Sequence, residues 1–162
     1  MLENVHMAGY VYNDLKLDNL LLDFDTDVES LLKTDDDIFD ENNVTLIDFG
    51  FVSSYLQKHS REHIAMQSMK TYQGNMVLSS LSMLQFESSS RRDDLKSLFY
   101  LMVYVLKKGN MPGIKIEEGQ DLNDLFLNCL EARENETEDE LCCGNTEDFK
   151  TFYREVSSYK FK

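Results

Sequence analysis

The strongest hydrophobic pattern in the chain lies between residues 92 and 108. Apolar side chains there occupy nearly the whole circumference of a helix, at Leu95, Leu98, Phe99, Leu101, Met102, Val103, Val105 and Leu106. A helix that is apolar all round is usually buried, so this pattern predicts the central helix of the domain. Lys107, Lys108 and Gly109 then supply positive charge and a C-terminal cap.

Two amphipathic helices are predicted after this central one. The first follows Asp121 as its N-cap, with apolar residues Leu122, Leu125, Phe126, Cys129 and Leu130 on one face. The second follows Thr146, with Phe149, Phe152, Tyr153 and Val156. The polar residues 131–140 between them predict a loop. At the other end of the chain, residues 2–6 predict the last turns of a helix that Gly9 ends.

Short β-prone runs occupy the first third of the chain. Residues 10–12 predict one strand, and residues 20–22 and 44–47 predict a hairpin. Residues 23–43, which connect the hairpin strands, carry nine acids and one lysine. They contain no glycine and lack the spacing of a calcium-binding loop, so we expect a solvated acidic surface insertion. Residues 51–90 show no convincing periodicity and predict a long irregular segment.

Composition narrows the class of protein. The 162 residues are 42% hydrophobic, which suits one domain, and the net charge of −14 argues against binding nucleic acid or an anionic membrane. The chain has no apolar run of membrane-spanning length and no evident secretory signal. Its three cysteines lack metal-ligand spacing and have an odd count. We therefore expect an intracellular protein, cytoplasmic or nuclear; the sequence does not indicate its oligomeric state.

Two short segments carry the candidate chemistry. Asp14, Lys16 and Asn19 form a D-x-K-x-x-N motif, and Asp48, Phe49 and Gly50 form D-F-G, each after apolar β-prone residues. In this order the two motifs are typical of protein kinases. The alternative is that these are ordinary loop acids and the end of a strand, which either motif alone would favour.

Phosphoryl transfer requires positioning and charge neutralisation, and the motif residues suit both. Asp14 would accept or orient the proton of a substrate hydroxyl, and Lys16 would neutralise charge on the transferred phosphoryl group. Asn19 and Asp48 offer the oxygen ligands that Mg²⁺ prefers. Phe49 and Gly50 would give Asp48 an apolar anchor and a hinge. His59 and His63 could share a helix face as metal ligands, but no third ligand lies nearby.

A third segment resembles one kinase family in particular. Residues 90–98 read S-R-R-D-D-L-K-S-L, and the casein kinase I family has S-R-R-D-D-L-E-S-L at the start of its central helix. Residues 74–82 and the L-C-C-G of residues 141–144 resemble further segments of that family. The resemblance implies an α+β, mostly helical C-terminal kinase lobe with a small hairpin, spanning residues 1–162. It also implies that Asp94 is the buried helix acid that holds the backbone of the catalytic loop, and that Arg91 and Arg92 are structural.

Four of the chain's departures from the family bear on its candidate chemistry. Tyr12 and Asn13 replace the His and Arg of H-R-D, and loss of that arginine removes a partner for activation-segment phosphate. Asn75 replaces a threonine that would bridge to Asp14 and Lys16; its amide could partly substitute. Val77 replaces an arginine associated with phosphate-primed substrates.

The resemblance implies a serine/threonine protein kinase that uses ATP and Mg²⁺ and acts on protein substrates. The sequence contains no glycine-rich phosphate loop and no V-A-I-K lysine, so we expect a truncated C-lobe without an N-lobe, inactive in isolation. One alternative is a kinase-derived interaction module without catalysis, a pseudokinase. Another is an acidic helical binding protein whose motifs arise by chance.

Overall fold

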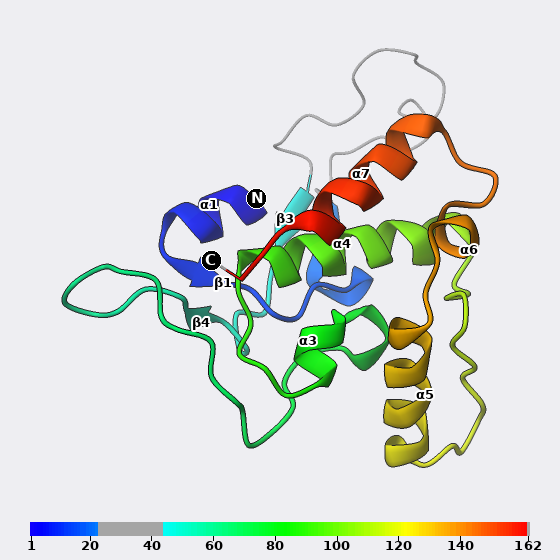
Figure 1. Ribbon diagram of the computed structural model, residues 1–162, viewed down its shortest axis with the longest axis horizontal. Coiled ribbons are helices and arrows are strands. Elements are labelled where there is room, and N and C mark those ends of the chain that lie inside the picture. Colours follow the sequence, from blue (N-terminus) through cyan, green and yellow to red (C-terminus); the bar gives the residue numbers. More distant parts are fainter. Residues whose placement is uncertain (23–43, 162) are drawn as a thin grey trace.

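The computed structural model describes residues 1–22 and 44–161, and within them it is mostly helical, with two short antiparallel strand pairs. This confirms the expected fold class. The predicted acidic insertion, residues 23–43, lies outside the described residues. Figure 1 labels the elements, which are α1 Leu2–Met7, β1 Tyr10–Val11, β2 Leu20–Leu22, β3 Val44–Leu46, β4 Ser53–Ser54, α3 Leu81–Leu84, α4 Arg91–Leu106, α5 Leu122–Glu134, α6 Glu138–Cys142, α7 Glu147–Ser158, and the 3₁₀ turns η1 Leu17–Asn19 and η2 Met76–Leu78.

Helix α4 lies at the centre of the molecule, with α7 packed along one side of it (Figure 1). The contact is aromatic: Phe99 of α4 is 1% exposed and stacks on Phe149 at 5.0 Å between ring centroids, with Tyr153 at 5.2 Å. Gly109, at φ +86°, donates its N–H to the Tyr104 carbonyl at 2.8 Å and closes the end of α4. The predicted central helix and its cap are therefore confirmed.

The predicted burial of α4 on every side is wrong at its C-terminal end. Met102, Val105 and Leu106 are 38%, 51% and 52% exposed. Periodicity cannot distinguish a helix surrounded by other elements from one that is covered only along part of its length. Within the described residues, α4 therefore keeps an apolar strip at its surface.

The predicted loop over residues 131–140 is also wrong. Helix α5 begins at its Asp121 cap as expected but continues to Glu134, and α6 starts four residues later. Thr137 caps α6 by accepting the Glu140 N–H at 3.3 Å, and three acids fill the first turn. Acids in that position interact favourably with the helix dipole, so the acidic composition here supports a helix start rather than a loop.

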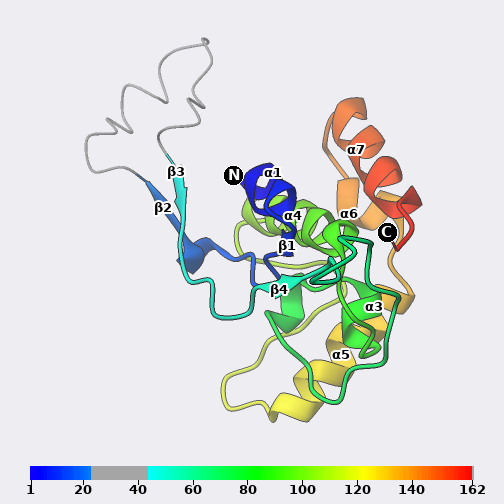
Figure 2. The same cartoon turned by 90° about the vertical axis from the view of Figure 1, so that its left-hand side faces the viewer.

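The predicted hairpin is confirmed by the antiparallel pairing of β2 and β3, in which Leu20 lies opposite Leu46. Figure 2 shows this pair standing to one side of the helices. A second pair joins β1 to β4, with Tyr10 opposite Ser54. The strand β4 could not be predicted from the sequence, because a Ser-Ser dipeptide has no hydrophobic alternation. Among the described residues, no helix has the length and apolar character needed to cross a membrane.

Candidate functional site

The segment between β1 and β2, residues 12–19, is held against the start of α4 by Asp94. The Asp94 carboxylate, 1% exposed, accepts the backbone N–H of Tyr12 at 2.7 Å and that of Asn13 at 2.8 Å. His6 of α1 adds a third contact, with its Nε2 2.8 Å from Oδ2 of Asp94. One buried carboxylate thus fixes the backbone just before Asp14, across a separation of more than 80 residues in the sequence.

The expected burial of Asp94 and its contact with the backbone of residues 12 and 13 are confirmed, and the neighbouring Asp93 is also fully buried. Its Oδ1 accepts the hydroxyls of Ser80 and Ser82 at 2.7 and 2.8 Å, and its Oδ2 accepts the Ser90 N–H at 2.8 Å. Asp93 connects the start of α4 to α3, whereas Asp94 connects it to residues 12 and 13. Adjacent helix residues point about 100° apart, which lets two neighbouring acids serve two separate partners.

Three of the four predicted polar site residues meet in one cluster, in which Asp14 and Asn19 are buried and Lys16 is partly exposed. Asp14 is 2% exposed, and its Oδ2 lies 2.8 Å from Nζ of Lys16 and 3.0 Å from Nδ2 of Asn19. The Asn19 amide also donates to the backbone carbonyl of Asp14 at 2.8 Å. The hydrogen bond to Asp14 raises the pKa of Lys16, so the ammonium stays charged at neutral pH.

The fourth residue, Asp48, reaches this cluster through the β2–β3 register. The Ile47 N–H donates to the Asn19 carbonyl at 3.0 Å, so the residue after Ile47 emerges beside the end of the buried segment. Asp48 lies close enough for its charge to contribute to the raised pKa of Lys16. Its side chain is exposed, its φ is +56°, and its Oδ1 accepts the Gly50 N–H at 3.1 Å.

The expected apolar anchor for Asp48 is only partly formed. Phe49 is 54% exposed, and its ring meets the edge of Tyr12 at 5.6 Å between centroids. Tyr12, where the family has histidine, is fully buried and donates its hydroxyl to the Ile47 carbonyl. Burial raises the pKa of this phenol, which keeps it protonated as a donor. Tyr12 therefore supports the backbone before Asp48.

Asn13, where the family has arginine, forms a local connection between two segments. Its Nδ2 donates to the Phe51 carbonyl at 2.7 Å and to the Ser53 hydroxyl at 2.9 Å. Its backbone φ is +71°, a conformation that asparagine tolerates better than most residues. Gly74 packs against it so closely that a Cβ there would lie 2.4 Å from the Asn13 carbonyl oxygen.

Asn75 has a different role from the one that the sequence suggested. Its Oδ1 accepts the N–H groups of Val77 and Leu78 at 3.0 and 3.3 Å, and so caps η2. Among the hydrogen bonds of the described residues, none joins Asn75 to Asp14 or Lys16. Lys16 and Asp14 instead contact each other directly, at 2.8 Å.

The two arginines at the start of α4 contact neighbouring aromatic rings and acids. The guanidinium of Arg91 lies 4.8 Å from the centroid of the Tyr55 ring. Arg92 lies 5.6 Å from the ring of Phe161 and 3.5 Å from Asp93. Both side chains therefore lie at the junction of α4 with the irregular segment, rather than in the Asp14 cluster.

A buried charged cluster that the sequence did not reveal lies on the other side of α4. Arg133 of α5 is 3% exposed, and its guanidinium donates to the carbonyls of Val77 and Ser79. It also stacks 3.7 Å from the centroid of the Tyr100 ring, whose hydroxyl donates to Glu136 at 2.9 Å. Burial raises the pKa of Glu136. The cluster anchors η2, and its only sequence signal is an arginine and an acid three residues apart.

Comparison with curated proteins finds casein kinase I proteins, although no protein-family model matches the chain. A casein kinase 1-like protein of Oryza sativa subsp. japonica is 30% identical over 99% of the chain, which covers 21% of that relative. A probable casein kinase I homolog of Encephalitozoon cuniculi is 30% identical over 93% of the chain and is covered over 44%. Casein kinase I homolog 2 of Schizosaccharomyces pombe is 26% identical over 98% of the chain and is covered over 34%.

The chain therefore spans less than half the length of these relatives, while they match nearly all of the chain. The part in common contains both candidate motifs and the double-arginine start of α4. Its mostly helical fold with a small hairpin agrees with the corresponding part of a kinase domain. The curated homologues of this chain are thus casein kinase I proteins, and its fold is consistent with part of a protein-kinase C-terminal lobe.

Proposed function

We propose that this chain supplies the catalytic loop of a serine/threonine protein kinase, which transfers a phosphoryl group from ATP to hydroxyl groups of protein substrates. The observation that supports the proposal best is the buried Asp14 carboxylate, which Lys16 and Asn19 contact at 2.8 and 3.0 Å. A carboxylate held this way has a defined position from which to orient a substrate hydroxyl, and positioning is the main requirement of phosphoryl transfer.

Asp14 and Lys16 would act as a pair. Asp14 would accept a hydrogen bond from the substrate hydroxyl and take up its proton as the new bond to phosphorus forms. Lys16, whose pKa is raised by Asp14, would remain cationic and turn toward the transferred phosphoryl group. At 28% exposure the Lys16 side chain has room to make that movement, while Asp14 at 3% does not.

Asn19 and Asp48 fit a magnesium site in their donor chemistry. Nδ2 of Asn19 donates to Asp14, so the amide oxygen of Asn19 points toward another partner. The Asp48 carboxylate is exposed. These are two hard oxygen ligands, a number typical of Mg²⁺ sites that take further ligands from water and phosphate. When bound, Mg²⁺ would neutralise charge on the phosphates of ATP.

The ATP site needs residues that this sequence does not contain. It has neither a glycine-rich phosphate loop nor the strand lysine that usually contacts the α- and β-phosphates. We therefore propose that the 162-residue chain alone binds Mg-ATP weakly or not at all and shows no measurable phosphoryl transfer.

The test joins the chain to the N-terminal lobe of a casein kinase I relative and measures ATP binding and transfer of radiolabelled phosphate to casein. Asp14→Asn and Asp48→Asn should each lower the rate by about two orders of magnitude or more. Asp18→Asn, an exposed acid in the same segment, is the matched control and should change the rate little. Strong transfer by the chain alone, or by the Asp14 variant, would contradict the proposal.

A second candidate is an interaction module without catalysis, and two observations favour it. Asn13 replaces an arginine with an amide that bonds to the backbone, and Asn75 caps η2 instead of contacting Asp14. A joined protein that binds Mg-ATP but transfers no phosphate would support this candidate. Restoration of transfer by Asn75→Thr would then identify the residue responsible.

A further inference from the structure

Asn13 joins the two segments that carry the carboxylates of the proposed site. It directly precedes Asp14, and its side chain reaches two residues that follow the Asp48–Gly50 turn. Asn13 is 6% exposed, and its Nδ2 lies 2.7 Å from the Phe51 carbonyl oxygen and 2.9 Å from the Ser53 hydroxyl. One buried side chain thus connects the segment of the proposed base to the segment of the proposed metal ligand.

The hydrogen-bond partners of Asn13 show which end of its amide makes this connection. The Phe51 carbonyl can only accept a hydrogen bond, so the atom beside it is the Nδ2 donor. Within the part of the chain that the structure describes, the amide oxygen Oδ1 makes no hydrogen bond. The side chain therefore acts through its donor, which an ionised aspartate of the same shape lacks.

The backbone of Asn13 is held independently of its side chain. Its N–H donates to Oδ1 of Asp94 at 2.8 Å, and its φ is +71°. Its carbonyl oxygen packs against Gly74, where a Cβ would lie only 2.4 Å away. Because this backbone is fixed on the central helix, the Nδ2 donor has a defined position from which to hold residues 51 and 53.

The Asp48–Gly50 turn is exposed but is bonded on both of its sides. Before the turn, the Ile47 N–H donates to the Asn19 carbonyl at 3.0 Å, and the Ile47 carbonyl accepts the Tyr12 hydroxyl. After the turn, the Asn13 amide makes the corresponding contacts. All of these partners belong to the segment between β1 and β2, which also carries the proposed base.

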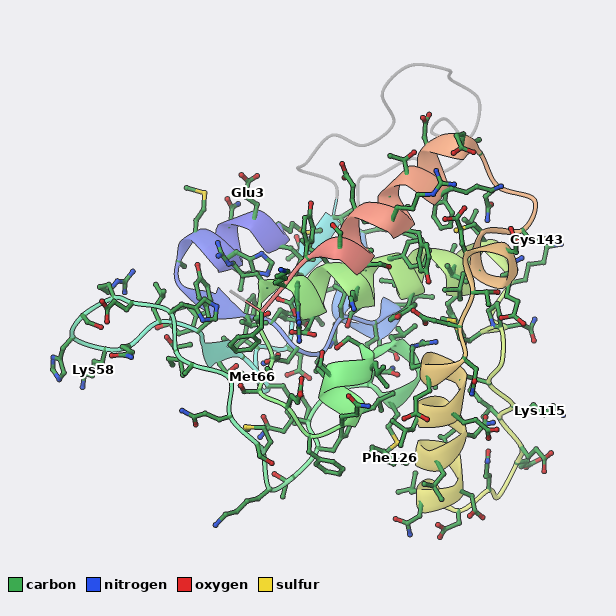
Figure 3. The ribbon with its side chains drawn as sticks, in the orientation of Figure 1. Glu3, Lys58, Met66, Lys115, Phe126 and Cys143 are labelled. Atoms are coloured by element: carbon green, nitrogen blue, oxygen red, sulfur yellow. The ribbon has the colours of Figure 1, made fainter. Side chains whose placement is uncertain are left out.

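The chain leaves the body of the molecule soon after these contacts. Figure 3 shows Lys58 at the far end of a loop that projects away from the helices. A projecting loop contributes little to the position of the residues before it, so their position depends on contacts with the body of the molecule. Asn13 makes such contacts, at Phe51 and Ser53.

We propose that Asn13 is a positioning residue that sets the position of the proposed metal ligand, Asp48, relative to the proposed base, Asp14. Its backbone is fixed beside Asp14, and its amide fixes the residues that follow Asp48. The two carboxylates therefore keep their relative position before nucleotide binds, and the site for Mg²⁺ needs little rearrangement. This inference rests on the proposed function, which supplies the roles of Asp14 and Asp48.

The first measurement is amide hydrogen exchange of the 162-residue chain, which does not depend on activity. Asn13→Asp keeps the shape of the side chain and removes the donor, and it should speed exchange of the amides of residues 51–54 about tenfold. Asn110→Asp is the matched control, because the Asn110 amide also donates to a carbonyl, that of Lys107 at 3.1 Å, after the end of α4. This control should leave residues 51–54 unchanged. Unchanged exchange in the Asn13 variant would overturn the proposal.

The second measurement uses the chain joined to the N-terminal lobe of a casein kinase I relative. In that protein, Asn13→Asp should lower kcat and raise the Mg²⁺ concentration that gives half-maximal rate, each about tenfold relative to Asn110→Asp. A side chain that only stabilised the fold would leave the Mg²⁺ requirement of the folded protein unchanged, and that result would also overturn the proposal.

A second variant and the parent protein complete the test. Ser53→Ala removes one of the two acceptors, so it should shift both measurements in the same direction by a smaller factor, and it replaces Asn13→Asp if that variant does not fold. A joined parent that transfers no phosphate would contradict the proposed function. In that case, faster exchange in the Asn13 variant still supports the connection between the two segments, and unchanged exchange still overturns it.

Discussion

The proposed catalytic-loop segment, residues 12–19, and the Asp48–Gly50 turn differ in how the rest of the chain holds them. Asp14 and Asn19 are 2% and 4% exposed, and the backbone N–H groups of Tyr12 and Asn13 donate to Asp94 of α4. Asp48 is exposed and Phe49 is 54% exposed. The D-x-K-x-x-N and D-F-G motifs are equally clear in the sequence, but only the first contains buried residues and adjoins backbone that is bonded to the core.

The difference arises from where the supporting contacts come from. Residues 12 and 13 are tied to Asp94, which lies on the central helix more than 80 residues away. Among the described residues, the Asp48 turn is held by the Gly50 N–H, by the Val52 N–H donated to the Phe49 carbonyl at 3.3 Å, and by a ring contact with Tyr12. Long-range contacts with the core fix a segment more firmly than local contacts in a turn. We infer that contacts with α4 fix the position of Asp14, whereas local contacts within the turn hold Asp48.

Substitution of Asp94 should give the largest loss of stability, and it tests whether Asp94 anchors residues 12 and 13. Asp94→Ala should lower the free energy of unfolding by about 4 kcal/mol, because two buried backbone N–H groups lose their acceptor. Urea denaturation would measure it, with Asp18→Ala as the exposed control. Asp93→Ala should cost a similar amount, since Asp93 accepts several hydrogen bonds in the same core. An Asp94 variant as stable as the Asp18 variant would refute the anchoring role.

Gly74 offers a smaller test of the same segment. Gly74→Ala should cost about 2–3 kcal/mol, because φ is +108° and the new Cβ would press on the Asn13 carbonyl. Gly119→Ala is the matched control: φ there is +78°, but nothing lies within 4 Å of the added Cβ. Equal costs in the two variants, measured by urea denaturation, would show that the contact with Asn13 contributes nothing.

Substitution of Phe49 tests how much its ring contact with Tyr12 stabilises the Asp48 turn. Phe49→Leu keeps an apolar side chain and removes the edge contact with Tyr12, and it should cost about 0.5–1 kcal/mol in unfolding free energy. Phe51→Leu, at a ring that is 41% exposed, is the control and should cost less. A cost of several kcal/mol for Phe49→Leu would mean that the turn is as firmly anchored as the catalytic-loop segment.

Asp48 should give the smallest effect on stability. Asp48→Asn changes an exposed side chain with one local hydrogen bond, and its unfolding free energy should stay within about 0.5 kcal/mol of the parent chain. Thermal and urea unfolding would measure it. A large loss would indicate that the carboxylate supports the fold, and the contrast with the Asp14 cluster would then disappear.

The sequence was sufficient to predict the elements that depend on local motifs and on regular hydrophobic patterns. It predicted α4, α5, α7, the β2–β3 hairpin and the acid that lies at the catalytic-loop backbone. It could not predict partners that tertiary packing brings together, such as the contact of His6 with Asp94 or the stacking of Arg133 on Tyr100. The sequence also predicted that Met102, Val105 and Leu106 are buried, but they are exposed. A hydrophobic pattern does not show which neighbouring elements cover a helix.

The most direct test of the central contrast is amide hydrogen exchange of the intact chain, followed residue by residue with NMR. We predict that the N–H groups of Tyr12 and Asn13 exchange as slowly as the buried amides of α4, because Asp94 accepts both of them. The N–H groups of Phe49 and Gly50 should exchange far faster. Rapid exchange at Tyr12 and Asn13, or equal protection of the two segments, would contradict the account.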